Sequence, residues 1–184
     1  MAAWNGNCLV LGQAGTGKGV LCSRMAEKYR EKGIPVYLLT CKEDEYISFP
    51  ADFKTMQQDR FLKEVMQHKF PCGLIAVVDE AWRWKWSGEG GLEAIPNSGR
   101  SRGVELWVQG QRAYQTPPNC RENCTNIFSF FQTSTSKKWL VENYGQEFEP
   151  VDTLEPGEFI YKAGMAPAVR ARCWEIKNGI FRRV

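Results

Sequence analysis

The chain has 184 residues, 43% of them hydrophobic and 24% charged, which are the proportions of an ordinary folded protein. This length predicts a single domain spanning residues 1–184. The net charge of +3 is too small to indicate nucleic-acid binding from bulk electrostatics alone. No apolar run approaches the roughly 18 residues of a membrane-spanning helix, and the first residues lack the basic segment of a signal peptide. We therefore expect a soluble protein made in the cytoplasm, with its seven cysteines as free thiols.

The first part of the sequence alternates short apolar runs with segments of helical periodicity. Residues 7–11 are typical of a buried strand, and a glycine-rich turn leads into a predicted helix at 18–32. Residues 36–40 favour a second strand, whereas 41–57 are predicted as a loop. The next helix is expected at 59–69, with Asp59 as its N-cap.

The following elements are predicted mainly as strands. Residues 74–78 are wholly apolar, as in a central strand buried on both faces. Further strands are expected at 104–109, 127–131, 159–161, 168–176 and 180–184, the last two joined by a turn at Lys177-Asn178-Gly179. Strands that alternate with helices predict an α/β fold with a mostly parallel central sheet flanked by helices. The last strands predict a small antiparallel C-terminal extension.

The glycine-rich turn has the residues and the spacing of a phosphate-binding loop. Gly12-Gln13-Ala14-Gly15-Thr16-Gly17-Lys18 matches the first seven positions of G-x-x-x-x-G-K-[ST]. Glycines let consecutive backbone N–H groups point at the phosphates, and the following helix presents its positive end to the same anion. Lys18 would offer its ammonium to the β- and γ-phosphate oxygens. Together with Gly19 and Val20, the loop is predicted to bind ATP.

One position departs from this pattern, because Gly19 stands where Ser or Thr would place a hydroxyl on Mg²⁺. Thr16 and Ser23 carry nearby hydroxyls, but neither occupies the matching position. One hypothesis is that water fills the missing ligand position, so that Asp79 anchors the hydrated ion.

Asp79 and Glu80 directly follow the apolar run at 74–78, as in a Walker B strand. In this arrangement Asp79 orients the Mg²⁺ shell, and Glu80 polarises the attacking water as general base. Ligands of open α/β sheets bind at the carboxyl ends of the strands. The loop and the acidic pair both fall at such ends, so they are expected to form one site.

A longer pattern follows the Walker elements. Gly99-Arg100-Ser101-Arg102-Gly103 precedes the apolar strand at 104–109, which ends in Gly110-Gln111-Arg112. This ordered set resembles the FtsK/HerA superfamily of DNA-pumping P-loop ATPases, whose members have an Arg-x-x-Gly turn, an apolar strand and a Gln-Arg pair at its end. Residues 126–136 and 154–170 resemble the later strands and the Ser-rich helix start of that family. The resemblance covers residues 7–172 and implies a P-loop, RecA-like fold.

The resemblance also implies catalytic roles for residues outside the two Walker elements. Gln111 would be the polar sensor of the γ-phosphate. Arg100 would be the arginine finger that reaches the ATP of a neighbouring subunit, with Arg102 as the second candidate. A solvent-facing turn is the alternative for both arginines. An arginine supplied in this way implies a homo-oligomeric ring.

The resemblance is greatest to the small genome-packaging ATPases of tailless, internal-membrane viruses with double jelly-roll capsids. It implies a motor that uses ATP and Mg²⁺ to translocate double-stranded DNA into a preformed capsid. Such a motor would work in the cytoplasm of the host cell or at a packaging vertex of the virion, beside capsid or membrane proteins. The alternative is a zonula occludens toxin-like assembly ATPase of filamentous phages. A nucleotide-binding switch or a small kinase is a third class.

Tryptophans and basic residues alternate in Trp82-Arg83-Trp84-Lys85-Trp86, directly after the acidic pair. An extended segment would place the three indoles on one face and the two cations on the other. One interpretation is an element that faces DNA or a partner through stacking and phosphate contacts. The other is an aromatic patch packed against a neighbouring subunit or against the domain's own edge.

Overall fold

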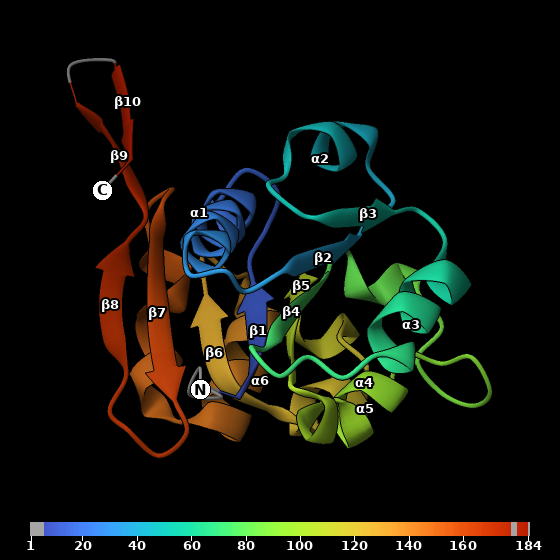
Figure 1. Ribbon diagram of the computed structural model, residues 1–184. Helices are drawn as coiled ribbons and strands as arrows, with labels where there is room; N and C mark the ends of the chain where they lie inside the picture. Colours follow the sequence, from blue (N-terminus) through green and yellow to red (C-terminus); the bar gives the residue numbers. More distant parts are fainter. Residues whose placement is uncertain (1–5, 178–179, 184) are drawn as a thin grey trace.

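The computed structural model describes residues 6–177 and 180–183, which are built around an eight-stranded sheet (Figure 1). The strand order is β3-β2-β4-β5-β1-β6-β7-β8. The strands are β1 (Asn7–Leu11), β2 (Val36–Leu39), β3 (Phe53–Thr55), β4 (Leu74–Val78), β5 (Val104–Gly110), β6 (Cys124–Ser129), β7 (Glu158–Ala163) and β8 (Val169–Arg172). All pairs among β1–β6 are parallel, whereas β7 and β8 pair antiparallel at one edge. The predicted parallel sheet with an antiparallel extension is confirmed.

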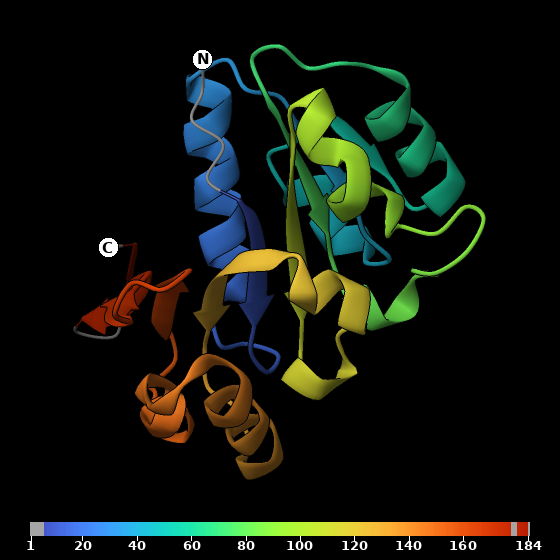
Figure 2. The same ribbon diagram turned by 90° about the horizontal axis from the view of Figure 1, so that it is seen from below.

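Helices cover both faces of this sheet. The α-helices are α1 (Lys18–Glu31), α2 (Glu43–Ser48), α3 (Gln58–Gln67), α4 (Ala94–Ser98), α5 (Pro118–Glu122) and α6 (Ser134–Tyr144). Four 3₁₀ segments join them, namely η1 (Ala81–Arg83), η2 (Gly99–Arg102), η3 (Ala113–Gln115) and η4 (Gln146–Thr153). Figure 2 shows α1 and α6 on opposite sides of β1 and β6. No helix among the residues that the structure describes is long and apolar enough to cross a bilayer.

Strand β1 shows how one short sequence serves both faces, because successive side chains of a strand point in opposite directions. Cys8 and Val10 pack with Leu21 of α1 in one core cluster. Leu9 and Leu11 pack in the other cluster, which also holds buried residues of α3, α4 and α6. All five residues of the strand are buried. This burial on both faces fixes β1, and with it the start of the glycine-rich turn, at the centre of the molecule.

The prediction of a loop at 41–57 is wrong, because this segment contains α2 and β3. Strand β3 has only three residues and pairs in parallel with the edge of β2. Helix α2 has six residues, and its Tyr46 and Ile47 are exposed. Elements this short leave no apolar periodicity in the sequence. Helix α3 is confirmed, although its N-cap is Gln57 rather than Asp59.

The strand predicted at 168–176 is interrupted at Cys173, where the chain turns toward α1. The carbonyl oxygen of Cys173 accepts a hydrogen bond of 3.1 Å from the Arg24 guanidinium instead of continuing the ladder. Beyond this point β9 (Trp174–Lys177) and β10 (Ile180–Arg183) form a separate antiparallel pair that projects from the sheet (Figure 1). Asn178 and Gly179 of the predicted turn lie outside the described residues.

Candidate functional site

Three strands of the parallel sheet end at one edge and open into a common cavity. The glycine-rich turn follows β1, Asp79-Glu80 follows β4, and Gln111 follows β5. The cavity between them has a volume of about 550 Å³, which lies within the range of small-molecule sites. We call it the loop cavity. It is lined by Ala14, Gly15, Gly17, Lys18, Gly19, Val20, Ser23, Lys42, Ser48, Phe49, Asp79, Glu80, Gln109, Gln111 and Trp174.

The turn itself has the tight backbone that its glycines predict. Gly17, the N-cap of α1, has a φ of 118°, and a Cβ at this position would lie 2.9 Å from the side chains of both Phe130 and Trp174. A Cβ on Gly12 would lie 2.6 Å from Phe130. Because an N-cap glycine has no side chain to cap the helix, the first N–H groups of α1 lack a side-chain acceptor and suit an anion.

The predicted loop residues divide into a lining and a support. Ala14, Gly15, Gly17, Lys18, Gly19 and Val20 line the cavity, whereas Gly12, Gln13 and Thr16 tie the loop to the sheet and to itself. Gly12 donates its N–H to the carbonyl oxygen of Gly110 at 3.1 Å. The Thr16 hydroxyl donates to the Gln13 carbonyl oxygen at 2.8 Å. The loop therefore keeps its shape through its own backbone.

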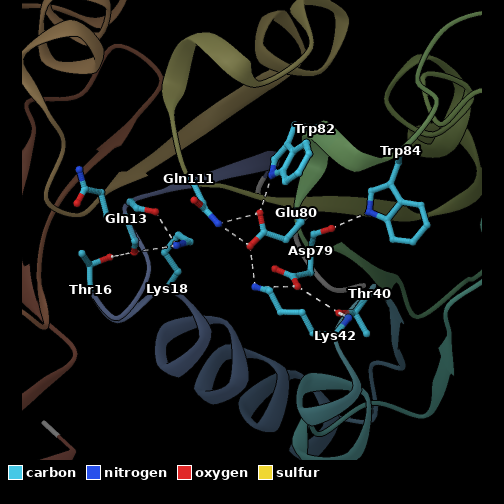
Figure 3. Close-up of polar contacts among 11 residues, drawn as sticks. Gln13, Thr16, Lys18, Thr40, Lys42, Asp79, Glu80, Trp82, Trp84 and Gln111 are labelled. Atoms are coloured by element: carbon cyan, nitrogen blue, oxygen red, sulfur yellow. Dashed lines mark hydrogen bonds and ion pairs between the residues drawn. The ribbon is translucent and has the colours of Figure 1, made fainter.

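Lys18 lies across the loop, where its ammonium donates to the carbonyl oxygens of Gly12 and Gln13 (Figure 3). Burial lowers the pKa of Lys18, and the ammonium of Lys42 adds to this effect, while Glu80 and Asp79 oppose it. The acidic pair across the cavity thus favours the charged form that a phosphate ligand needs.

Asp79 is buried at the end of β4 among groups that donate to it. The Thr40 hydroxyl, at the end of β2, donates to Asp79 Oδ2 at 3.1 Å. The ammonium of Lys42 lies 3.3 Å from the same oxygen. The indole N–H of Trp84 donates to the Asp79 carbonyl oxygen at 2.7 Å. These contacts fix the carboxylate at the edge of the sheet, facing the loop (Figure 3).

Glu80 has an unusual backbone conformation that aims its carboxylate into the loop cavity. Its φ is 50°, which makes it the one non-glycine residue with a positive φ among the residues described. Such a conformation is costly for a residue with a Cβ and is concentrated at functional sites. In return the side chain, although buried, meets three donors, one each from Lys42, Trp82 and Gln111.

The protonation of Glu80 follows from these partners. Lys42 Nζ lies 2.7 Å from Glu80 Oε1, the Trp82 indole donates to Oε2 at 2.8 Å, and Gln111 Nε2 donates to Oε1 at 3.0 Å. Burial alone would raise the pKa of Glu80, but hydrogen bonds from Lys42, Gln111 and Trp82 outweigh it and hold the pKa below its ordinary value. The group is therefore an anion at neutral pH, as a general base must be.

Gln111 connects Glu80, which follows β4, with Gln132, which follows β6. Its side-chain amide donates to Glu80, and its main-chain carbonyl oxygen accepts a hydrogen bond of 3.2 Å from Gln132 Nε2. Gln132 is fully buried, and this hydrogen bond links it to Gln111. The structure thus places Gln111 in direct contact with Glu80, while its role as a sensor of the γ-phosphate stays a prediction.

The residues near Asp79 have the chemistry of a magnesium site. Mg²⁺ prefers oxygen ligands and keeps several waters. The Asp79 carboxylate and the Thr40 hydroxyl bring two such oxygens together, whereas Gly19 contributes no side chain. The donor set therefore fits a hydrated ion held by Asp79. Thr40 is a hydroxyl that the sequence analysis does not identify.

Arg100 and Arg102 lie at the opposite edge of the sheet from the loop cavity. Both belong to η2, which precedes Val104, the first residue of β5. Val104 pairs with Leu74, the first residue of β4. The seven residues of β5 span about 23 Å. Neither arginine therefore approaches Glu80 of its own chain, which is the condition for a residue that would act on a neighbouring subunit.

The tryptophan–basic stretch packs mainly on its own domain. Residues 81–83 form the 3₁₀ segment η1, so the three indoles do not lie on one face of an extended segment. Trp86 is buried and donates to the carbonyl oxygen of Ala81 at 2.7 Å, as Trp84 does to that of Asp79. Trp82 is 49% exposed, and the Arg83 guanidinium lies 4.8 Å from its ring centre. The three indoles thus each donate a hydrogen bond to the turn that carries Glu80.

Four further residues that were not predicted belong to this site or its support, namely Thr40, Lys42, Gln132 and Trp174. A signal was available for two of them, because Thr40 and Lys42 follow the strand at 36–40, at the same sheet edge as Asp79. Gln132 and Trp174 carry no motif, and their positions depend on how the C-terminal half folds back.

Lys42 generates a testable prediction, because it supplies the cation that offsets Asp79 and Glu80. Lys42→Met should weaken binding of metal-free ATP up to about fivefold, a modest effect for a side chain that is 44% exposed. Lys42→Arg should bind as the parent does. Titration calorimetry in EDTA measures both. Lys28→Met, which removes an exposed lysine of α1 outside the loop cavity, is the matched control, and equal losses at the two positions would refute a local role.

The sequence matches no protein-family model and no curated protein. The fold, however, is similar to several solved structures. The genome packaging NTPase B204 from Sulfolobus turreted icosahedral virus 2 in complex with AMP aligns with a TM-score of 0.73 and 15% identity, over 91% of this chain and 97% of B204. The pCW3 conjugation coupling protein TcpA aligns with a TM-score of 0.67 and 16% identity, over 91% of this chain and 60% of TcpA. VirB4 of Thermoanaerobacter pseudethanolicus aligns with a TM-score of 0.67 and 10% identity, over 90% of this chain and 88% of VirB4. The resemblance seen in the sequence is therefore confirmed at the level of the fold, which is that of the P-loop ATPases.

Proposed function

We propose that this chain is an ATP-hydrolysing motor that translocates double-stranded DNA, packaging a viral genome into a preformed capsid. The observation that carries the proposal is the convergence of Lys18, Asp79, Glu80 and Gln111 on one cavity. These residues come from the ends of three separate strands, β1, β4 and β5, and each has a chemically matched role in phosphoryl transfer. The structural likeness to a genome packaging NTPase over 91% of the chain supports the same class of motor.

The chemistry follows from where each side chain lies. The loop from Gly12 to Val20 and the Lys18 ammonium bind the phosphates, with Gly12, Gln13 and Thr16 holding the shape of the loop and the lining residues presenting their amides. Glu80 accepts a proton from a water molecule while the oxygen of that water attacks the γ-phosphorus. The bond between the γ-phosphorus and the β,γ-bridging oxygen then breaks, which releases ADP and phosphate. Gln111, held against Glu80, orients the same water and reads the γ-phosphate. Mg²⁺, held by Asp79, would neutralise charge on the phosphate oxygens.

Arg100 is the proposed trans-acting arginine, with Arg102 as the second candidate. Their place at the far edge of the sheet means that any ATP they contact belongs to another subunit. An arginine supplied across a boundary stabilises the charge that spreads over the γ-phosphoryl oxygens. It also couples hydrolysis in one subunit to the position of the next, as a homo-oligomeric ring motor requires.

The proposed setting is the cytoplasm of a host cell or a packaging vertex of the virion, beside capsid or membrane proteins. Exposed Trp82 and Arg83, next to the catalytic turn, are candidate contacts for the DNA backbone and bases. The alternative, a zonula occludens toxin-like assembly ATPase, is not favoured by the likeness to B204, which covers 97% of that protein.

The central test separates binding from turnover. Glu80→Gln should retain ATP, because the loop and Lys18 are intact, and should lose most turnover, about 10²–10⁴-fold, because an amide cannot take up the proton. Lys18→Ala should lose ATP binding itself. Steady-state phosphate release and titration with a non-hydrolysable analogue measure the two properties. Unchanged turnover in Glu80→Gln would remove Glu80 from the mechanism.

A second test addresses the coupling to DNA. Phosphate release by the parent protein should rise when double-stranded DNA is added, and particle mass with ATP analogue and DNA should correspond to a closed ring. Mass photometry and a coupled ATPase assay provide both readings. Turnover that ignores DNA and responds instead to membrane vesicles or coat protein would favour the assembly ATPase, and turnover in a monomer would favour a switch or kinase.

The trans role of Arg100 can be tested by mixing two defective proteins. Arg100→Ala should lower turnover about 10³-fold or more, as expected for an arginine finger. Mixing it with Glu80→Gln should restore part of the activity, because some sites then combine an intact Glu80 with a neighbour's intact Arg100. Arg102→Ala tests the second candidate, and Arg60→Ala, an exposed arginine of α3, is the control. A mixture that stays inactive would contradict action across a boundary.

A further inference from the structure

Trp174 lies on the side of the phosphate loop that faces away from the acidic pair. The strand order places β5 and β4 on one side of β1, and β6, β7 and β8 on the other. Asp79 and Glu80 follow β4, whereas Trp174 begins β9, with only Cys173 between it and β8. All three nevertheless line the loop cavity. The cavity therefore has carboxylates toward one end and an indole toward the other, with the loop between them.

The indole is fixed against the loop by the backbone around it. A Cβ on Gly17 would lie 2.9 Å from Trp174 Nε1, and a Cβ on Gly157 would lie 3.0 Å from Trp174 Cδ2. The ring is thus seated between two glycines that leave it room. Gly157 also donates its N–H to the Thr16 carbonyl oxygen at 2.9 Å. Loop and indole therefore form one structural unit.

The polypeptide on both sides of Trp174 strengthens this attachment. Cys173 donates its N–H to the Gly157 carbonyl oxygen at 2.8 Å, and its own carbonyl oxygen accepts from Arg24 of α1 at 3.1 Å. Trp174 is only partly buried, and it lines the loop cavity. A ring that is held in place before a ligand arrives loses little conformational entropy on binding.

From this geometry we infer that Trp174 is the residue on which the base of the bound nucleotide stacks. The inference rests on the proposed nucleotide binding by the loop. A triphosphate held by Lys18, with its γ-phosphate toward Glu80, extends its α-phosphate and nucleoside away from the acidic pair. Along that direction the lining changes from charged groups to the Trp174 indole. A flat aromatic base and an indole bind by burying apolar faces with offset stacking.

Stacking of this kind recognises a flat ring rather than a particular base, because every base has a π-face. Trp174 would therefore add affinity for nucleoside triphosphates in general over inorganic polyphosphate. It would act on binding and would leave the chemistry at the γ-phosphate to Glu80 and Gln111. The role of the indole can therefore be isolated by comparing a ligand that has a base with a ligand that has only the phosphates.

The experiment compares a non-hydrolysable ATP analogue with inorganic tripolyphosphate, which has the phosphates and no base. Trp174→Ala should weaken the analogue about ten- to hundredfold, the usual loss for one base–aromatic contact. Its affinity for tripolyphosphate should stay within about twofold of the parent protein. Trp174→Leu, which keeps apolar bulk without an aromatic face, should show the same selective loss, whereas Trp174→Phe should retain most of the affinity.

Equal losses for the two ligands in both Trp174→Ala and Trp174→Leu would overturn the inference, because the indole would then only brace the loop. An unchanged affinity for the analogue would overturn it as well. Trp139→Ala, in which the tryptophan removed belongs to α6 and not to the loop cavity, is the matched control and should bind both ligands normally. Failure of the proposed function would give a different result, because Lys18→Ala would then bind both ligands as tightly as the parent protein does.

Discussion

The parallel register of β1, β4 and β5 is the constraint on which the rest of the site depends. Leu11 pairs with Gly110, and Val78 pairs with Val108, so the three strands end within a few residues of one another. Parallel strands require crossover connections, and here these carry the helices that bury both faces of the sheet. Because β1 and β4 are buried on both sides, a slip of register would expose a core face and is strongly disfavoured. The register of the strands alone therefore brings the polar residues at their ends together, and no specific contact among these side chains is needed.

Charge balance then decides which form the assembled groups take. Two carboxylates at the end of β4, both buried, would repel each other if nothing compensated them. Lys42 contacts both, and its own pKa is raised, because the bonds to Glu80 and Asp79 outweigh its partial burial. Lys18 supplies a second cation across the cavity. The result is a site in which the Glu80 carboxylate is ionised and its strained φ is balanced by three donors.

The sequence was sufficient for the parts of this structure that rest on periodicity or on a fixed motif. The apolar runs at β1 and β4, the helix after the loop, and the shared edge of Lys18, Asp79, Glu80 and Gln111 were all predictable, since each follows from one local pattern and the rule for parallel sheets. Helix α2 was missed because it is short and exposed, and strand β3 because it has only three residues. Thr40 and Lys42 were missed although they follow the predicted strand at 36–40, at the same sheet edge as Asp79. Gln132 and Trp174 could not be identified because their roles arise from long-range packing, and the 3₁₀ turn at 81–83 depends on indole contacts with main-chain carbonyls.

The two ends of β5 place a geometric condition on any assembly in which Arg100 serves another subunit. Gln111 and the loop cavity lie at one end of the strand, and Arg100 precedes the other. A two-fold dimer would bring the same patch of each chain together and could not repeat around a ring. A heterologous, head-to-tail contact instead sets the amino edge of one sheet against the carboxyl edge of the next, and it closes into a ring when the rotation permits. In that arrangement each nucleotide would lie at a subunit boundary. Binding and hydrolysis of ATP would then depend on the relative position of the neighbouring subunits, and would in turn change it.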